Sequence, residues 1–129
     1  MAVLKLTTEQ AIQEFDRRCA EFEAAMRAAG SPVKCTDGYR SIDEQNRLYA
    51  QGRTKPGRIV TKARGGESPH NYHLAKDYCF KLPHGAVSWA GDWRLFGKTA
   101  KDCGLEWGGG WLKFVDRPHI QLRSWREHR

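Results

Sequence analysis

Two histidines and an aspartate lie close together in SPHNYHLAKDY, residues 68–78. A catalytic zinc needs three protein ligands of His, Asp, Glu or Cys type and one open position for water, which the metal acidifies into a nucleophile. The side chains of His70 and Asp77 converge if His70 ends a loop and Asp77 lies within a strand. Histidines also serve as hydrogen-bonded core residues, so this spacing alone leaves both interpretations open.

The other groups of such a site must come from elsewhere in the chain. His119 follows Pro118 at the start of a predicted strand, which makes it the candidate third ligand. Asp116, earlier in the same segment, can reach a zinc-bound water without coordinating the metal and is the candidate general base. Trp107 and Trp111 flank three glycines. Both could line a cleft, although Trp107 suits the core equally well.

These residues need elements that position them. Capping residues and apolar spacing predict three helices, which run from Thr7 or Thr8 to Gly30, from Ser41 to near Gly52, and from Asp92 to Gly104. Alternation and β-rich composition predict four strands, which are Val33 to Tyr39, Leu74 to Phe80, Leu105 to Trp107 and His119 to Leu122. The polar run 52–68 between them is a long surface loop, a kind of loop that is often functional. We expect an α+β fold, with a small antiparallel sheet and flanking helices.

Length and charge limit the classes of protein. The chain of 129 residues predicts a single domain over 1–129. Its 22 Lys and Arg against 15 Asp and Glu give a net charge of +7, which suits a polyanion such as nucleic acid or a cell envelope. The sequence lacks the spacings typical of nucleic-acid-binding motifs, so we expect no nucleic acid partner. No apolar run suits a signal peptide or a membrane span, and synthesis in the cytosol is expected.

The cysteines do not suggest a second metal site. Cys19, Cys35, Cys79 and Cys103 lie far apart and form no CxxC pair, which argues against a structural zinc held by four thiolates. In a cytosolic chain we expect four reduced thiols.

Four segments resemble one family in the same order and spacing. SPHNYHLAKDY is similar to the S-x-H-x-x-G-x-A-x-D signature of zinc peptidases that include VanY-type D-Ala-D-Ala carboxypeptidases and the L-alanyl-D-glutamate endopeptidases of phage endolysins. The segments GYRSIDEQNRLYAQGRTKPG, IVTKARGGES and GLEWGGGWLKFVDRPHIQ resemble the same family. The resemblance therefore covers most of the chain from Gly38 onward.

The resemblance implies a role for each matching residue. It makes His70, Asp77 and His119 the ligands of Zn²⁺ and Asp116 the catalytic base. It also implies that Arg40 neutralises a substrate carboxylate or the developing oxyanion, a task that suits its planar, permanently charged guanidinium. Ser68 would help to orient the substrate.

Two departures from the family pattern matter most. His73 stands where the family has glycine, and Lys76 where it has a small or apolar residue. If the strand begins early enough, His73 lies on the same face as Asp77, and we expect it to line the cleft or to hydrogen-bond a ligand. Lys76 would then point to the opposite face.

The resemblance implies a monomeric zinc peptidase that cleaves the stem peptide of peptidoglycan. A phage or prophage endolysin that cuts the L-Ala-D-Glu bond or a cross-link, and acts on the wall after release from the host cytoplasm, is the favoured hypothesis. No separate wall-binding domain is expected. The alternatives are a D-Ala-D-Ala carboxypeptidase, a non-catalytic wall-binding module on the same scaffold, and nucleic-acid binding through the basic end.

Overall fold

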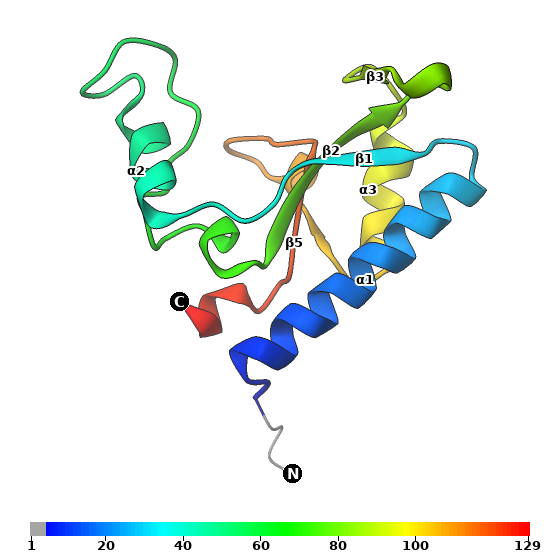
Figure 1. Ribbon diagram of the computed structural model, residues 1–129, viewed down its shortest axis with the longest axis horizontal. Coiled ribbons are helices and arrows are strands. Elements are labelled where there is room, and N and C mark those ends of the chain that lie inside the picture. The colour runs from blue at the N-terminus through cyan, green and yellow to red at the C-terminus, as the bar shows by residue number, and fades with distance from the viewer. Residues whose placement is uncertain (1–4) are drawn as a thin grey trace.

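The computed structural model describes residues 5–129 as an α+β fold (Figure 1). Its helices are α1 Thr8–Ala28, α2 Ile42–Ala50 and α3 Trp93–Asp102, and its strands are β1 Val33–Asp37, β2 Ala75–Lys81, β3 Val87–Ser88, β4 Glu106–Trp107 and β5 His119–Gln121. Short 3-10 helices are η1 Pro69–Tyr72, η2 Pro83–Gly85, η3 Gly108–Gly110 and η4 Trp125–His128. Within these described residues, no helix is both long and apolar enough to cross a membrane.

The strands form one antiparallel sheet in the order β1, β2, β5, β4, with β3 beside β2. In this register Asp77 of β2 lies opposite His119 of β5. Gln121 of β5 lies opposite Ala75 on one side and Glu106 on the other. Because directly opposed residues point to the same face of a sheet, these polar side chains all gather on one face.

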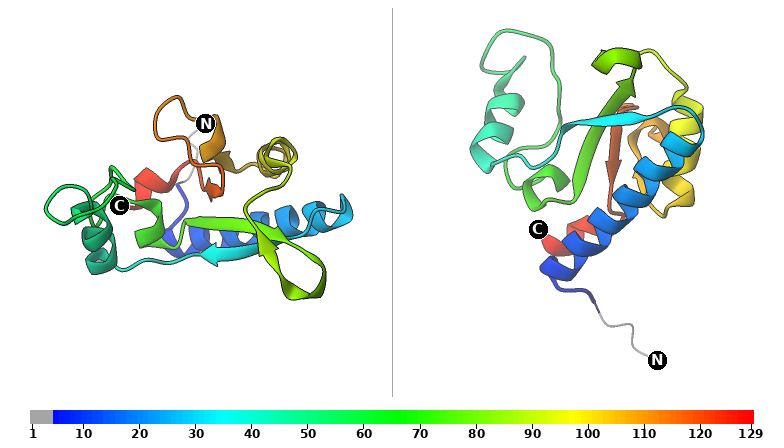
Figure 2. Two further views of the ribbon diagram at one scale, coloured as in Figure 1. Left: turned by 90° about the horizontal axis from the view of Figure 1, so that it is seen from above. Right: turned by 45° about the vertical axis from the view of Figure 1, so that its right-hand side comes forward.

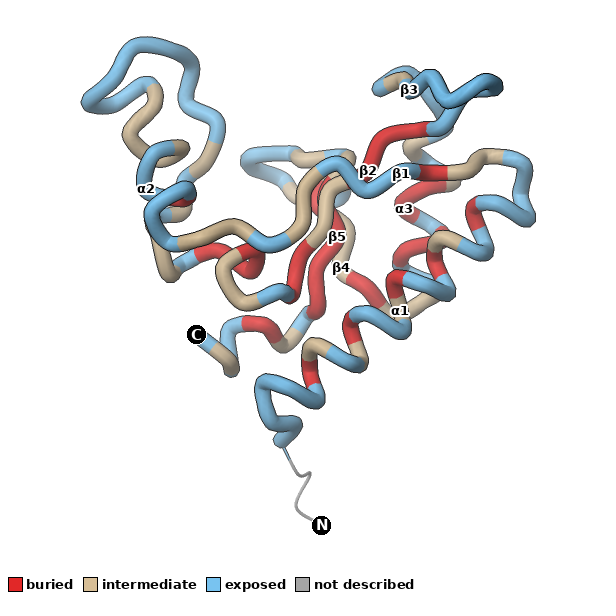
Figure 3. The backbone as a smooth tube through the Cα atoms, viewed as in Figure 1, coloured by how far each residue is buried: buried red, intermediate tan, exposed pale blue. Residues whose placement is uncertain are grey.

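The other face carries the core, against which α1 packs. A capping box between Thr7 and Gln10 begins this helix, and its buried stripe consists of Ala11, Phe15, Cys19, Phe22 and Met26. Phe22 packs edge-on against Tyr78 of β2 and Phe96 of α3, which joins both helices to the sheet. Figure 3 shows these buried positions on the side of α1 that faces the strands.

Helix α2 stands apart from α1 and α3, at the other end of the sheet, as two views show (Figures 1 and 2). Ser41 and Glu44 form the predicted capping box at its start. The loop that follows α2 is tied back to it, because the Gly65 N–H donates to Asn46 Oδ1 over 2.8 Å and Gln45 Nε2 donates to the Ala63 carbonyl over 2.8 Å.

The predicted fold class is confirmed, with the predicted helices and strands in the predicted order. The strand predicted at Leu74 begins at Ala75, because His73 adopts a left-handed conformation with φ of 59° and turns the chain. The segment before it is the unpredicted η1, where Ser68 caps a turn that Pro69 begins. Strand β3 was also not predicted.

Candidate active site

Three side chains from three elements converge on the polar face of the sheet. His70 comes from η1, Asp77 from β2 and His119 from β5, and one donor atom of each lies within 4.8 Å of the others. Asp77 Oδ1 lies 3.4 Å from His70 Nε2 and 3.0 Å from His119 Nδ1. The structure therefore brings together the three residues that the sequence proposed as ligands.

Hydrogen bonds at the far side of each ring determine which nitrogen faces this cluster. His70 Nδ1 lies 2.7 Å from the Gly38 carbonyl, which only accepts, so Nδ1 carries the proton and Nε2 faces Asp77. His119 Nε2 lies 2.7 Å from Gln121 Oε1, which leaves Nδ1 toward Asp77. Two ring nitrogens and a carboxylate thus face one another, an arrangement that a cation between them would satisfy by accepting a lone pair from each ring. This N, N, O donor set fits Zn²⁺.

The electrostatics of the cluster keep Asp77 ionised. Burial raises the pKa of this carboxyl, but hydrogen bonds from His119 and His70 outweigh burial and hold the pKa well below its usual range. For His119, burial lowers the pKa of the ring, while the hydrogen bond and charge of Asp77 outweigh burial and raise it. A deprotonated carboxylate is the form that binds a metal.

Asp116 lies at the edge of this cluster. Its Oδ2 is 3.9 Å from His119 Nδ1, and 47% of its side chain is exposed, so water can reach it. Partial burial raises the pKa of Asp116, against the effect of His119, and the charge of Asp77 raises it further. Its N–H donates to the Gly108 carbonyl, and a Cβ at Gly108 would lie 2.4 Å from the Asp116 carbonyl oxygen. Glycine at position 108 therefore allows this approach.

Arg40 is not a free surface charge, because its side chain is only 13% exposed. Its Nε donates to Asp37 Oδ2 over 3.0 Å, and its Nη1 donates to Gln45 Oε1 over 2.8 Å. Its Nη2 lies 3.7 Å from Asp77 Oδ2. The sequence did not identify Asp37 or Gln45 as partners, since Asp37 lies just outside the segments that resemble the family and nothing within residues 38–57 singles out Gln45.

An open cleft of about 900 Å³ surrounds the cluster and Asp116. The loops 59–63 and 111–116 and the start of η1 contribute to its walls. Trp111 lines it, with the ring centroid 5.2 Å from that of His119. Ser68 also lines it, although its Oγ accepts the His70 N–H over 3.3 Å and so acts as the cap of η1. Trp107 instead packs on the core and donates to the Arg117 carbonyl.

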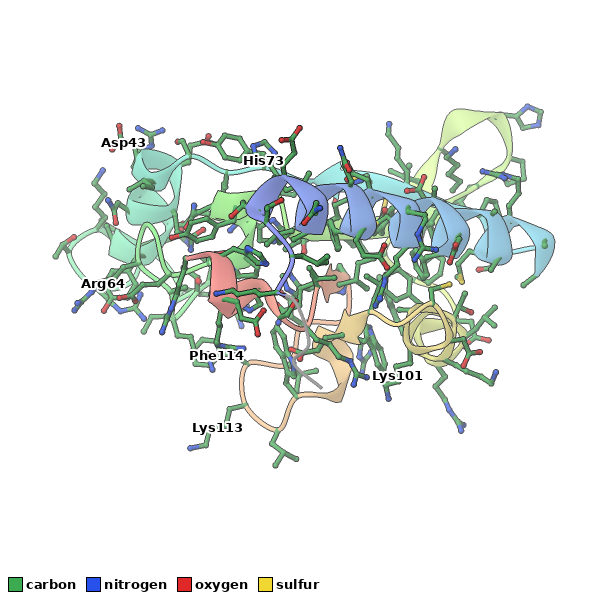
Figure 4. All side chains as sticks on the ribbon, turned by 90° about the horizontal axis from the view of Figure 1, so that it is seen from below. Asp43, Arg64, His73, Lys101, Lys113 and Phe114 are labelled. Carbon is green, nitrogen blue, oxygen red and sulfur yellow. The ribbon has the colours of Figure 1, made fainter. Side chains whose placement is uncertain are left out.

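His73 does not lie where we expected it. Because the strand begins after it, its ring turns away from Asp77 and stacks on Tyr39, with centroids 4.2 Å apart. It is exposed and is not among the residues that line the cleft. Figure 4 shows it on the side of the molecule opposite Phe114 of the cleft wall. Lys76 points to the α1 face as predicted, with Nζ 3.8 Å from Asp16 Oδ1.

The fold and the cluster define a candidate metal-dependent hydrolase, and comparison with known families agrees with this class. Residues 8–85 match the model of the VanY family, described as D-alanyl-D-alanine carboxypeptidase. Residues 61–122 match a second peptidase model, of the M15 class, with the same description. The chain therefore belongs to the VanY family of D-alanyl-D-alanine carboxypeptidases, which confirms the resemblance seen in the sequence.

Two curated relatives are described as L-alanyl-D-glutamate peptidases or endopeptidases. The chain is 44% identical over 110 residues to the peptidoglycan L-alanyl-D-glutamate endopeptidase CwlK of Bacillus subtilis, a match covering 78% of this chain and 66% of the relative. It is 33% identical over 82 residues to the L-alanyl-D-glutamate peptidase of Listeria phage A118, a match covering 58% and 29%. The chain thus spans just under two thirds of the first relative and less than a third of the second.

Solved structures establish the same fold. The L-Ala D-Glu endopeptidase ChiX of Serratia marcescens has a TM-score of 0.63 at 24% identity, over 96% of this chain and 91% of ChiX. A variant of the D,D-pentapeptidase VanY from the VanB-type resistance cassette, in complex with Zn(II), has a TM-score of 0.62 at 16% identity, over 87% and 72%.

Proposed function

We propose that this protein is a zinc-dependent peptidase that hydrolyses the stem peptide of bacterial peptidoglycan. The observation that carries the proposal is the convergence of the His70, Asp77 and His119 donors within 4.8 Å in an open cleft that Asp116 also lines. The names of the relatives supply the substrate class, because the curated proteins and ChiX are described as acting on the L-Ala-D-Glu bond or on peptidoglycan.

The residues of the cleft divide the work of amide hydrolysis. Zinc held by the three donors would supply a Lewis acid for the scissile carbonyl and a water of lowered pKa. Asp116 takes a proton from the attacking water and delivers it to the leaving nitrogen, so that the amide becomes a carboxylate and an amine. Arg40, held by Asp37 and Gln45, balances negative charge on the substrate or on the tetrahedral oxyanion.

We favour the L-Ala-D-Glu bond as the bond that is cut, since the 44% identity to CwlK is the strongest likeness to a curated protein reported above. The second candidate is D-Ala-D-Ala carboxypeptidase action, which the description of the family model favours. A phage or prophage endolysin is the proposed biological role, supported by the relative from Listeria phage A118.

Digestion of purified muropeptides, followed by mass spectrometry, tests the function. An endopeptidase of the proposed kind leaves L-Ala attached to the glycan and releases a peptide that begins with D-Glu, whereas a carboxypeptidase releases only D-Ala. Both products must disappear with a chelator and return with zinc. If the zinc-loaded protein left the muropeptides intact, the remaining hypothesis would be a non-catalytic wall-binding module.

A further inference from the structure

A chain of hydrogen bonds runs from His119 away from the proposed metal position. His119 Nε2 lies 2.7 Å from Gln121 Oε1, and Gln121 Nε2 donates to Glu106 Oε2 over 2.6 Å. The same oxygen of Glu106 accepts the indole N–H of Trp111 over 3.3 Å. Glu106 and Gln121 lie directly opposite each other on β4 and β5, so the sheet itself holds this contact in place.

The carboxylate of Glu106 gives this series of hydrogen bonds a direction. A carboxylate only accepts hydrogen bonds, so the amide of Gln121 must turn its NH₂ toward Glu106 and its oxygen toward His119. An amide oxygen also only accepts, so His119 Nε2 must carry a proton. Nδ1, which lies 3.0 Å from Asp77 Oδ1, is then the nitrogen whose proton a metal would displace, while Nε2 keeps its own.

We propose that Glu106 is a positioning residue, which acts through Gln121 to fix the tautomer of His119 that binds the metal through Nδ1. The proposal deepens the proposed function and rests on it for the identity of the metal. Glu106 also has a second role. Its hydrogen bond to Trp111 fixes this part of the cleft wall to the same carboxylate that orients His119.

Burial explains why a charged group is needed for this task. Gln121 is 2% exposed, so water cannot easily supply the partners that its amide would lose. With a neutral acceptor and donor at position 106, the amide of Gln121 could turn over and present its NH₂ to His119. The proton of the neutral ring would then move to Nδ1, where it competes with the metal. Groups that orient metal ligands in this way typically change metal affinity by about 10- to 100-fold.

The first test is Glu106→Gln, which keeps the size of the side chain and removes its charge. Competition with a chromophoric chelator should give a zinc dissociation constant about 10- to 100-fold higher than that of the wild type. Glu127→Gln is the matched control, since it makes the same change at an exposed position outside the cleft and should keep the wild-type zinc affinity. Unchanged affinity in Glu106→Gln overturns the proposal, and so does an equal loss in both variants.

A second measurement needs no folded variant. Long-range ¹H–¹⁵N spectra of the zinc-loaded wild-type protein should show His119 with its proton on Nε2 and with Nδ1 bound to the metal. A proton on Nδ1 overturns the proposal. Neither measurement uses substrate. A protein that binds zinc as expected but cuts no muropeptide would therefore contradict the proposed function and leave this inference standing.

Discussion

At the scale of single residues, Asp116 is the group on which turnover should depend most directly. It lines the cleft at 3.9 Å from His119 and is not one of the three converging donors. Asp116→Asn should therefore lower kcat for muropeptide cleavage by about 10²- to 10⁴-fold, because general base catalysis is lost. Zinc content after dialysis should stay at the wild-type level. Wild-type turnover in this variant would rule out the proposed mechanism, and the exposed Glu127→Gln serves as the control.

The position of His73 in the sequence suggested a chemical role, but its backbone conformation explains this position better. Its φ of 59° is a conformation that glycine adopts without strain, which accounts for glycine in the family pattern. His73→Ala keeps the strain and loses the stack on Tyr39, whereas His73→Gly removes the strain. Urea unfolding should therefore find the glycine variant more stable than the alanine variant by about 1 kcal/mol.

Zinc content separates the two histidines of the segment. His73→Gly should keep its zinc, and His70→Ala should lose it, because only His70 directs a nitrogen at Asp77. The opposite pattern would reverse the assignment of the ligands.

The residues proposed to bind the metal or to act as the base could be identified from the sequence. The residues that hold them in position could not. His70, Asp77, His119 and Asp116 lie in two short segments whose residue types already suggest a metal and a base. Glu106 and Gln121 become partners only through the pairing of β4 with β5, a long-range contact that no local pattern encodes.

At the scale of elements, Gln45 joins α2 to both sides of the cleft. It is fully buried, accepts from Arg40, and donates to Thr61 Oγ1 and to the Ala63 carbonyl. Gln45→Leu should lower the free energy of unfolding by about 1–3 kcal/mol, because it leaves these partners unsatisfied. It should also raise KM, since Arg40 and the loop 59–63 both line the cleft. Gln13→Leu on the exposed side of α1 is the matched control, and an equal effect there would contradict this role.

The starts of helices α1 and α2 were predictable because their signals are local. Thr7 with Gln10 and Ser41 with Glu44 mark the starts of α1 and α2 in the sequence as they do in the structure. The two-residue strand β3 was missed, since two residues show no period, and so was η1, whose cap and proline resembled the end of a loop.

At the scale of the whole molecule, zinc should contribute to stability because its donors come from η1, β2 and β5, which lie far apart in the sequence. A ligand that binds only the folded state stabilises it by about 2.7 kcal/mol at a hundred times its Kd. Calorimetry should therefore show that a chelator lowers Tm and that added zinc restores it. In His70→Ala the chelator should have little effect. An equal fall of Tm in both proteins would show that the chelator acts elsewhere.

The pairing of Asp77 with His119 has a consequence for how folding can be observed. A slip of one residue between β2 and β5 would turn one of these side chains to the α1 face, so the two can share a metal only in the native register. During refolding in the presence of Co²⁺, the rise in visible absorption of the bound ion would then report when this one long-range pairing forms. The local turn around His70 can form earlier without producing this absorption.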